Sequence, residues 1–168
     1  MQTILDKNQL HLTIQRLAHQ LLENHPGIEN IALIGIQTGG IYLADKIVEI
    51  LKEIQDKKIQ YGKLDITFYR DDIRKEHHVP NQTEIPFSIE NKMVILIDDV
   101  LFTGRTIRAA MDALQDFGRP QKVELCVLID RKSSRQLPIQ PDYYGKAIDS
   151  IISETVKVKW DREEVVLF

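Results

Sequence analysis

Apolar residues near the start of the chain recur at the three- and four-residue spacing of a helix with one buried face. This stripe predicts a helix from about Lys7 to Asn24, with Asp6 as its N-cap. The sequence His25-Pro26-Gly27 should end it, because proline and glycine interrupt helices. The stripe consists of Leu10, Ile14, Leu17, Ala18 and Leu21.

Farther along, continuous apolar runs alternate with segments of helical pattern. Two expected strands, Ile31–Ile36 and Met93–Ile97, each lead through a glycine-containing turn into a helix. Buried strands that alternate with helices are typical of a parallel sheet covered on both faces. We therefore expect an α/β fold whose ligands bind beyond the carboxyl ends of the strands. The other expected strands are Ile59–Tyr69, Val123–Ile129, Tyr143–Ile148, Val156–Trp160 and Val165–Phe168.

Length and composition indicate one ordinary globular domain. The 168 residues are 43% hydrophobic and 28% charged, and no linker or repeat divides them, so we assign residues 1–168 to a single domain. The net charge of -3 provides no global basic surface for nucleic acid. No apolar run approaches the roughly 20 residues of a membrane span, and the N-terminus lacks the apolar core of a signal peptide. We therefore expect a cytoplasmic protein.

The segment Val94–Thr106 is the most informative part of the chain. A buried strand runs into two adjacent carboxylates, Asp98 and Asp99, and a Thr-Gly-Arg-Thr turn then opens a helix. The free N–H groups at a helix N-terminus bind anions such as phosphate, while two carboxylates suit a sugar diol or a cation. Together they describe a site for a ribose 5-phosphate. The alternative is a plain strand-to-helix corner, with Thr103 as N-cap and solvated aspartates.

This segment resembles the motif by which type I phosphoribosyltransferases bind phosphoribosyl pyrophosphate (PRPP). The resemblance implies a twisted, mainly parallel sheet with helices on both faces and a small hood, and Mg²⁺ as cofactor. It also implies that Asp98 and Asp99 contact the ribose and act in catalysis. The residues it assigns to PRPP in the following loop are Val100, Leu101, Phe102, Thr103, Gly104, Arg105 and Thr106.

Several further strings resemble the PyrR group of this family, pyrimidine operon attenuators that are also uracil phosphoribosyltransferases. The implied substrates are PRPP and uracil, the implied product is UMP, and the implied assembly is a homo-oligomer, a dimer or higher. Phe102 stands where many purine-specific members carry an acid, which argues against a purine base. The strings are Asp65–Asp72, Met111–Leu114, Gly118–Pro120 and Val127–Arg131, beside Asp98–Thr106.

The resemblance also assigns residues outside the central segment. Thr38, Gly39 and Gly40 would bind pyrophosphate, although PyrR proteins usually carry arginine where Gly39 stands. The polar stretch Arg70–Ile85 would close over PRPP, with Arg70 as a catalytic residue and Arg74 also within reach of pyrophosphate. The residues implied to face or read the base are Asp130, Arg131, Val156, Lys157 and Val158.

Two other functions are open at this point. A regulator that senses UMP or PRPP and binds an mRNA hairpin would use an RNA face that includes Arg16, His19 and Arg135. Gln15, Asn24 and Gln140 stand where RNA-binding relatives tend to have hydroxyl or basic residues, which weakens phosphate neutralisation. A purine phosphoribosyltransferase is the third interpretation.

Overall fold

A five-stranded sheet forms the centre of the computed structural model, which describes residues 1–71 and 82–168. All its strands are parallel, in the order β3-β2-β4-β5-β6. Their carboxyl ends therefore meet at one edge, as the sequence predicted. The strands are β2 (Ile31–Ile36), β3 (Gln60–Leu64), β4 (Met93–Leu101), β5 (Lys122–Arg131) and β6 (Tyr143–Ile148).

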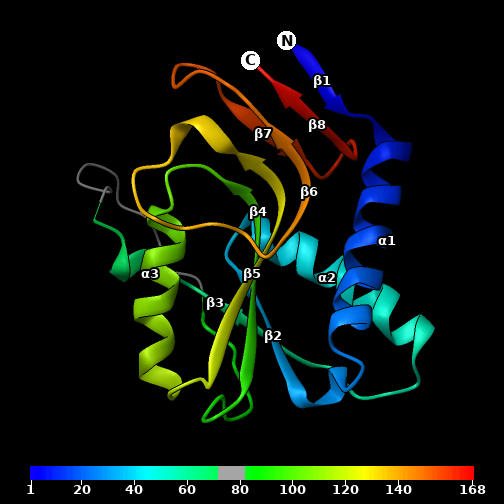
Figure 1. The fold of residues 1–168 in the computed structure, drawn as a ribbon, viewed down its shortest axis with the longest axis vertical. Helices are drawn as coiled ribbons and strands as arrows, with labels where there is room; N and C mark the ends of the chain where they lie inside the picture. Colours follow the sequence, from blue (N-terminus) through cyan, green and yellow to red (C-terminus); the bar gives the residue numbers. More distant parts are fainter. Residues whose placement is uncertain (72–81) are drawn as a thin grey trace.

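Helices cover both faces of this sheet (Figure 1). Helices α1 (Lys7–Asn24) and α2 (Gly39–Ile54) lie on one side, and α3 (Arg105–Leu114) lies on the other. Two apolar cores result: α1 and α2 pack over residues such as Leu33, whereas α3 packs over residues such as Leu96. The predicted α/β class is thus confirmed. Among the described residues, no helix is long and apolar enough to cross a membrane.

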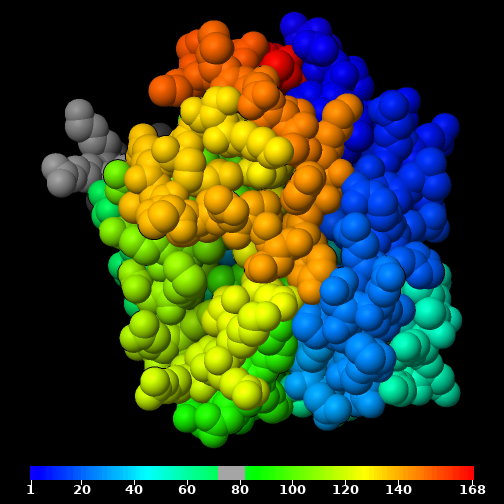
Figure 2. All heavy atoms as spheres, viewed as in Figure 1, coloured from blue at the N-terminus to red at the C-terminus, as the bar shows by residue number. Residues whose placement is uncertain are grey.

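A three-stranded antiparallel sheet forms the hood above the carboxyl edge of the main sheet. It consists of β1 (Gln2–Leu5), β8 (Glu164–Leu167) and β7 (Val156–Lys159), in the order β1-β8-β7. It joins the two ends of the chain, which lie side by side at the top of Figure 1 and again in the space-filling view of Figure 2. Within residues 1–71 and 82–168, the remaining elements are single-turn 3₁₀ helices: η1 (Ile28–Asn30), η2 (Thr67–Tyr69), η3 (Gln115–Phe117) and η4 (Lys132–Ser134).

Helix α1 has the predicted bounds, and its N-cap is confirmed. The Asp6 carboxylate accepts a hydrogen bond from the Gln9 N–H, and the Gln9 side chain accepts one from the Asp6 N–H. This reciprocal pair is a capping box, which satisfies N–H groups that the first turn of a helix leaves without partners.

The expected strand Ile59–Tyr69 is wrong in its second half. Strand β3 ends at Leu64, because the Asp65 carboxylate accepts hydrogen bonds from the N–H and the hydroxyl of Thr67 and turns the chain into η2. Strand β4 is longer than expected: it was predicted to end at Ile97, but it continues to Leu101 in register with β5. The two aspartates of the central motif are therefore held inside a strand.

The core position of α1 supports a stability prediction. Leu17→Ala should lower the free energy of unfolding by about 2–5 kcal/mol, because the side chain is fully buried between α1 and the sheet. Leu12→Ala makes the same change on the same helix, but Leu12 is 64% exposed, and it should shift stability by less than about 0.5 kcal/mol. Urea denaturation of both variants measures the difference, and equal effects would contradict the assigned orientation of the helix.

Candidate functional site

Three segments meet at the carboxyl edge of the sheet. Residues 37–40 follow β2, residues 98–106 include the end of β4, and residues 130–137 include the end of β5. Because β4 pairs with both β2 and β5, the segment 98–106 lies between the other two. These are the strand ends at which the sequence predicted a ligand site.

The turn before α3 forms one wall of a cavity of about 320 Å³. Gly104, the N-cap of α3, has a φ of 94°, a left-handed conformation that glycine adopts without steric cost. Every residue that the sequence assigned to the PRPP loop lines this cavity, and the structure adds Ile107 and Gln136. The lining is Arg70, Asp98, Val100, Leu101, Phe102, Thr103, Gly104, Arg105, Thr106, Ile107 and Gln136.

Asp98 lines this cavity, and Asp99 follows it in β4 outside the lining. The Asp98 side chain accepts a hydrogen bond from the Asp99 N–H (2.9 Å), and the Asp99 side chain accepts one from the Val100 N–H (2.8 Å). Burial raises the pKa of both carboxyls, and the neighbouring charge of Asp99 raises that of Asp98 further, while Arg70 opposes the effect. Hydroxyl donors or a cation placed against this pair would stabilise its ionised form.

Residues 37–40 pack directly against the end of β4. A Cβ atom on Gly40 would lie 2.3 Å from the Ile97 carbonyl oxygen, and one on Gly39 would lie 2.0 Å from an oxygen of Asp99. The Gln37–Thr38 peptide is cis, and Thr38 is exposed. A side chain at residue 39 therefore requires a different position of the Asp99 carboxylate.

The Arg105 side chain is bonded to two other side chains. Its guanidinium forms an ion pair with Asp71 (2.9 Å) and donates to the Gln136 side chain (2.8 Å). Arg108 binds the same Asp71 carboxylate and holds its pKa below the usual value. Arg70 lines the cavity beside Asp98. Most of the predicted closing loop, Arg74 included, falls in residues 72–81 and lies outside the described residues.

The two predicted base residues at the end of β5 direct their side chains toward other protein groups. The buried Arg131 guanidinium stacks over the Phe102 ring at 3.9 Å and donates to the Ser150 side chain and to the carbonyls of Ile151 and Glu154. The buried Asp130 carboxylate is paired with Arg135. Arg131 thus contacts both Phe102, which precedes the Thr-Gly turn, and the segment that leads into β7 of the hood.

The other predicted base residues, Val156, Lys157 and Val158, form most of strand β7. In the described hood sheet β7 pairs with β8 on one side and occupies an edge. An edge strand presents N–H and carbonyl groups that its own sheet does not use. The backbone of β7 is therefore suited to bind the polar edge of a flat ligand.

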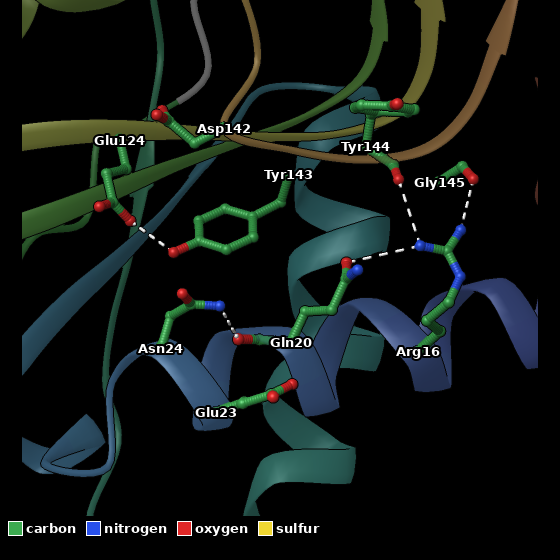
Figure 3. Close-up of a pocket in the computed structure, with 9 residues that line it drawn as sticks. All are labelled: Arg16, Gln20, Glu23, Asn24, Glu124, Asp142, Tyr143, Tyr144 and Gly145. Atoms are coloured by element: carbon green, nitrogen blue, oxygen red, sulfur yellow. Dashed lines mark hydrogen bonds between the residues drawn. The ribbon is translucent and has the colours of Figure 1, made fainter.

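The residues expected on an RNA face differ in their surroundings. The Arg16 guanidinium turns toward the carbonyls of Tyr144 and Gly145, as Figure 3 shows. It lies in a cavity of about 610 Å³ whose lining also includes three carboxylates, and His19 is exposed on the same helix. Arg135 is half-buried, since its partners are Asp130 and the Phe102 carbonyl. The three carboxylates are those of Glu23, Glu124 and Asp142.

The raised pKa of Asp98 predicts that Asp98→Asn stabilises the fold at neutral pH. An unfolded Asp titrates near ~3.9, so the charged form is less favourable in the folded state, and this penalty is complete above the raised folded pKa. The penalty disappears as the pH falls below the unfolded value. The variant should therefore be more stable than the original chain at neutral pH, with an advantage that shrinks toward acidic pH.

Urea denaturation between about pH 4 and pH 8 measures this difference. Asp112→Asn, which removes an exposed carboxylate on α3, is the control and should change stability little at any pH. An Asp98→Asn variant that is less stable at neutral pH would contradict the raised pKa.

The close contact of residues 37–40 with β4 predicts that Gly40→Ala destabilises the fold by about 1–3 kcal/mol, because the clash is with backbone atoms that cannot rotate away. Gly27→Ala is the control, since its Cβ would meet only the Asn30 side chain at 3.4 Å. Thermal unfolding compares the two variants, and similar melting temperatures would show that the loop is not tightly packed.

Sequence comparisons identify the family. A model of the phosphoribosyl transferase domain matches residues 1–163. The bifunctional protein PyrR of Geobacter sp. (strain M21) is 48% identical over 170 residues, which cover 98% of this chain and 96% of that protein. The bifunctional protein PyrR of Caldicellulosiruptor bescii is 49% identical over 160 residues, which cover 94% and 87%.

Solved structures agree with this at the level of the fold. The hypoxanthine phosphoribosyl transferase of Trypanosoma cruzi superimposes with a TM-score of 0.76 at 16% identity, covering 99% of this chain and 90% of that chain. A hypoxanthine phosphoribosyltransferase from Staphylococcus aureus gives 0.68 at 22% identity, covering 88% and 77%. The chain therefore belongs to the phosphoribosyltransferase family and, within it, to the PyrR proteins.

Proposed function

We propose that this protein transfers the phosphoribosyl group of PRPP to uracil, giving UMP and pyrophosphate. The observation that carries the proposal is the cavity at the N-terminus of α3, where the predicted phosphate loop and Asp98 line the same space. Backbone N–H groups and the helix dipole favour a phosphate at this position. The adjacent carboxylates accept hydrogen bonds from the two ribose hydroxyls.

Phe102 supports a pyrimidine rather than a purine as the base. The ring is uncharged and is held under the Arg131 guanidinium, so it offers no carboxylate to a purine ring nitrogen. Arg131 also fixes the segment before β7. We infer that the edge of β7 that the described hood sheet does not use faces the base through N–H and carbonyl groups. In this arrangement Asp130 and Arg131 shape the base pocket through their protein contacts, and Val156–Val158 read the edge of uracil.

The reaction needs positioning and charge stabilisation more than a reactive side chain. The bond from uracil N1 to the anomeric carbon forms as the bond from that carbon to the pyrophosphate oxygen breaks, and the N1 proton passes to solvent water. Thr38, Gly39 and Gly40 present backbone groups to the leaving pyrophosphate, and Arg70 adds positive charge beside Asp98. Asp98 and Asp99 orient the ribose, and their negative charges stabilise the positive charge that develops on it.

Mg²⁺ fits this site as a cofactor held mainly by the substrate. Burial and mutual repulsion raise the pKa of the Asp98–Asp99 pair, so the pair carries negative charge that a cation would offset. Across residues 1–71 and 82–168, no group of three or more His, Cys, Asp or Glu side chains is arranged to hold a metal ion. When bound, the ion would neutralise pyrophosphate charge, with Asp98 and Asp99 nearest to the ribose oxygens.

A nucleotide-sensing regulator that binds an mRNA hairpin is the alternative. Its phosphate contacts would need free basic groups, and Arg16 and Arg135 are both bonded to main-chain carbonyls. Three carboxylates share the cavity of Arg16, and the net charge is -3. These charges oppose the approach of RNA, because affinity for nucleic acid depends on phosphate neutralisation. We therefore favour catalysis as the main function.

The test is product formation from PRPP with magnesium and one of four bases: uracil, hypoxanthine, guanine or orotate. We expect UMP from uracil and no product from the purines. Asp99→Asn should lower uracil turnover by about a hundredfold or more while the fold persists, because the ribose loses an ionised partner. Turnover of Asp99→Asn within about tenfold of the original chain would contradict the role of the carboxylate pair.

Turnover of a purine instead of uracil would overturn the proposed specificity. PRPP or UMP binding without turnover of any base would favour the regulator. A titration with hairpin RNA at several salt concentrations would then be decisive, since phosphate contacts give a steep dependence of affinity on salt.

A further inference from the structure

Residues 135–137, which follow η4, are hydrogen-bonded to the phosphate loop, residues 102–106, at several points. Arg135 donates to the Phe102 carbonyl (2.7 Å), and the N–H groups of Gln136 and Leu137 donate to the Thr103 carbonyl (3.0 and 3.2 Å). In the opposite direction, Arg105 donates to the Gln136 side chain (2.8 Å). In Figure 1 the gold segment after β5 accordingly lies beside the upper end of α3. These contacts hold the loop from the side.

Arg135 is the charged member of this set, and its guanidinium is itself fixed. One nitrogen donates to Phe102, and the other forms an ion pair with Asp130 at 2.5 Å. The Asp130 side chain is 6% exposed and that of Arg135 is 17% exposed, so solvent screens this pair only weakly. Asp130 belongs to β5 and is in register with Leu101 of β4. Because Arg135 binds both Asp130 and the Phe102 carbonyl, it connects the end of β5 to the residue that follows β4.

The contact at Phe102 controls the direction of the next N–H group. A peptide unit is planar, and in its trans form the carbonyl and the following N–H point in opposite directions. When Arg135 holds the Phe102 carbonyl, the Thr103 N–H is turned to the other side, and the bonds to the Thr103 carbonyl orient the Gly104 N–H in the same way. Neither N–H has a hydrogen-bond partner among the described residues, and both residues line the cavity before α3.

We propose that Arg135, paired with Asp130, is a positioning residue for the PRPP site. It aligns the Phe102–Gly104 backbone so that successive N–H groups face the 5′-phosphate. Arg135 is therefore part of the phosphate site's support and not a free contact for RNA. The inference rests on the proposed binding of PRPP, but it does not depend on which base is used.

The experiment measures dissociation constants for PRPP, UMP and uridine by calorimetry with the full chain. Arg135→Gln should weaken PRPP and UMP about tenfold or more, because a charge-assisted hydrogen bond that orients the loop is lost. Uridine has the same base and ribose without the phosphate, so its affinity should change less than about threefold. The ratio of UMP to uridine affinity thus reports the phosphate loop, whereas a general loss of structure would weaken both ligands.

Two further variants and a control sharpen the result. Arg135→Lys keeps one charged donor and should recover part of the lost PRPP affinity, while Asp130→Asn should shift the UMP-to-uridine ratio in the same direction as Arg135→Gln. If Arg135→Gln does not fold, which thermal unfolding will detect, these two variants carry the test. Arg162→Gln removes an exposed arginine whose only described partner is Asp161 at 4.0 Å, and it should leave all three affinities unchanged.

The outcomes separate this inference from the proposed function. If the original chain binds neither PRPP nor UMP, the proposed function is wrong and the inference fails with it. If the original chain binds both, but the folded Arg135 and Asp130 variants keep the same UMP-to-uridine ratio, only the role of Arg135 is wrong. A selective fall in that ratio, with partial recovery in Arg135→Lys, supports it.

Discussion

The contact between residues 37–40 and the end of β4 is the constraint on which the site depends. Only a residue without a side chain allows the loop to lie against the Ile97 carbonyl, because a Cβ on Gly40 would be 2.3 Å from that oxygen. The same approach brings Gly39 against the Asp99 carboxylate. The backbone at the end of one strand is thereby placed directly beside the carboxylates at the end of the next.

That arrangement carries a cost in stability. Two adjacent carboxylates inside a strand repel one another, and burial disfavours their charged forms. A protein selected for stability alone would place apolar residues there, as it does at the four preceding positions of β4. In the proposed function, bound hydroxyl groups and a cation would offset this cost, so the unfavourable electrostatics would contribute to the affinity for PRPP.

Local patterns predicted much of this fold, and non-local contacts explain most of what was missed. The Lys7–Asn24 stripe and the Asp98–Thr106 motif each contain their own signals, a cap in one case and a strand-to-helix turn in the other. Strand β1 was missed because its partner is β8 at the other end of the chain. The end of β3 was missed although its signal was present, since Asp65 and Thr67 form a recognisable turn.

The residues of the site also divide into those that a local motif predicts and those that depend on non-local contacts. The loop residues followed from the motif, whereas Gln136 did not, because its place in the cavity depends on a contact with Arg105. Arg135 reads as a surface residue in a polar segment, and its two partners, Asp130 and the Phe102 carbonyl, become apparent only when β4 and β5 lie together. Pairing between strands can bury a charged side chain that looks solvent-exposed in the sequence. The residues near it in the sequence do not show which distant groups will be its partners.

The hood has a consequence for the order of assembly. Residue Gln2 pairs with Leu167, so its first and last strands come from opposite ends of the chain. During synthesis β1 must wait without its partner until β8 has emerged from the ribosome. Contacts between such distant residues form late, because a large loop must close before any bond is gained. The parallel sheet and the loop before α3 can thus be complete on a nascent chain whose hood has not yet formed.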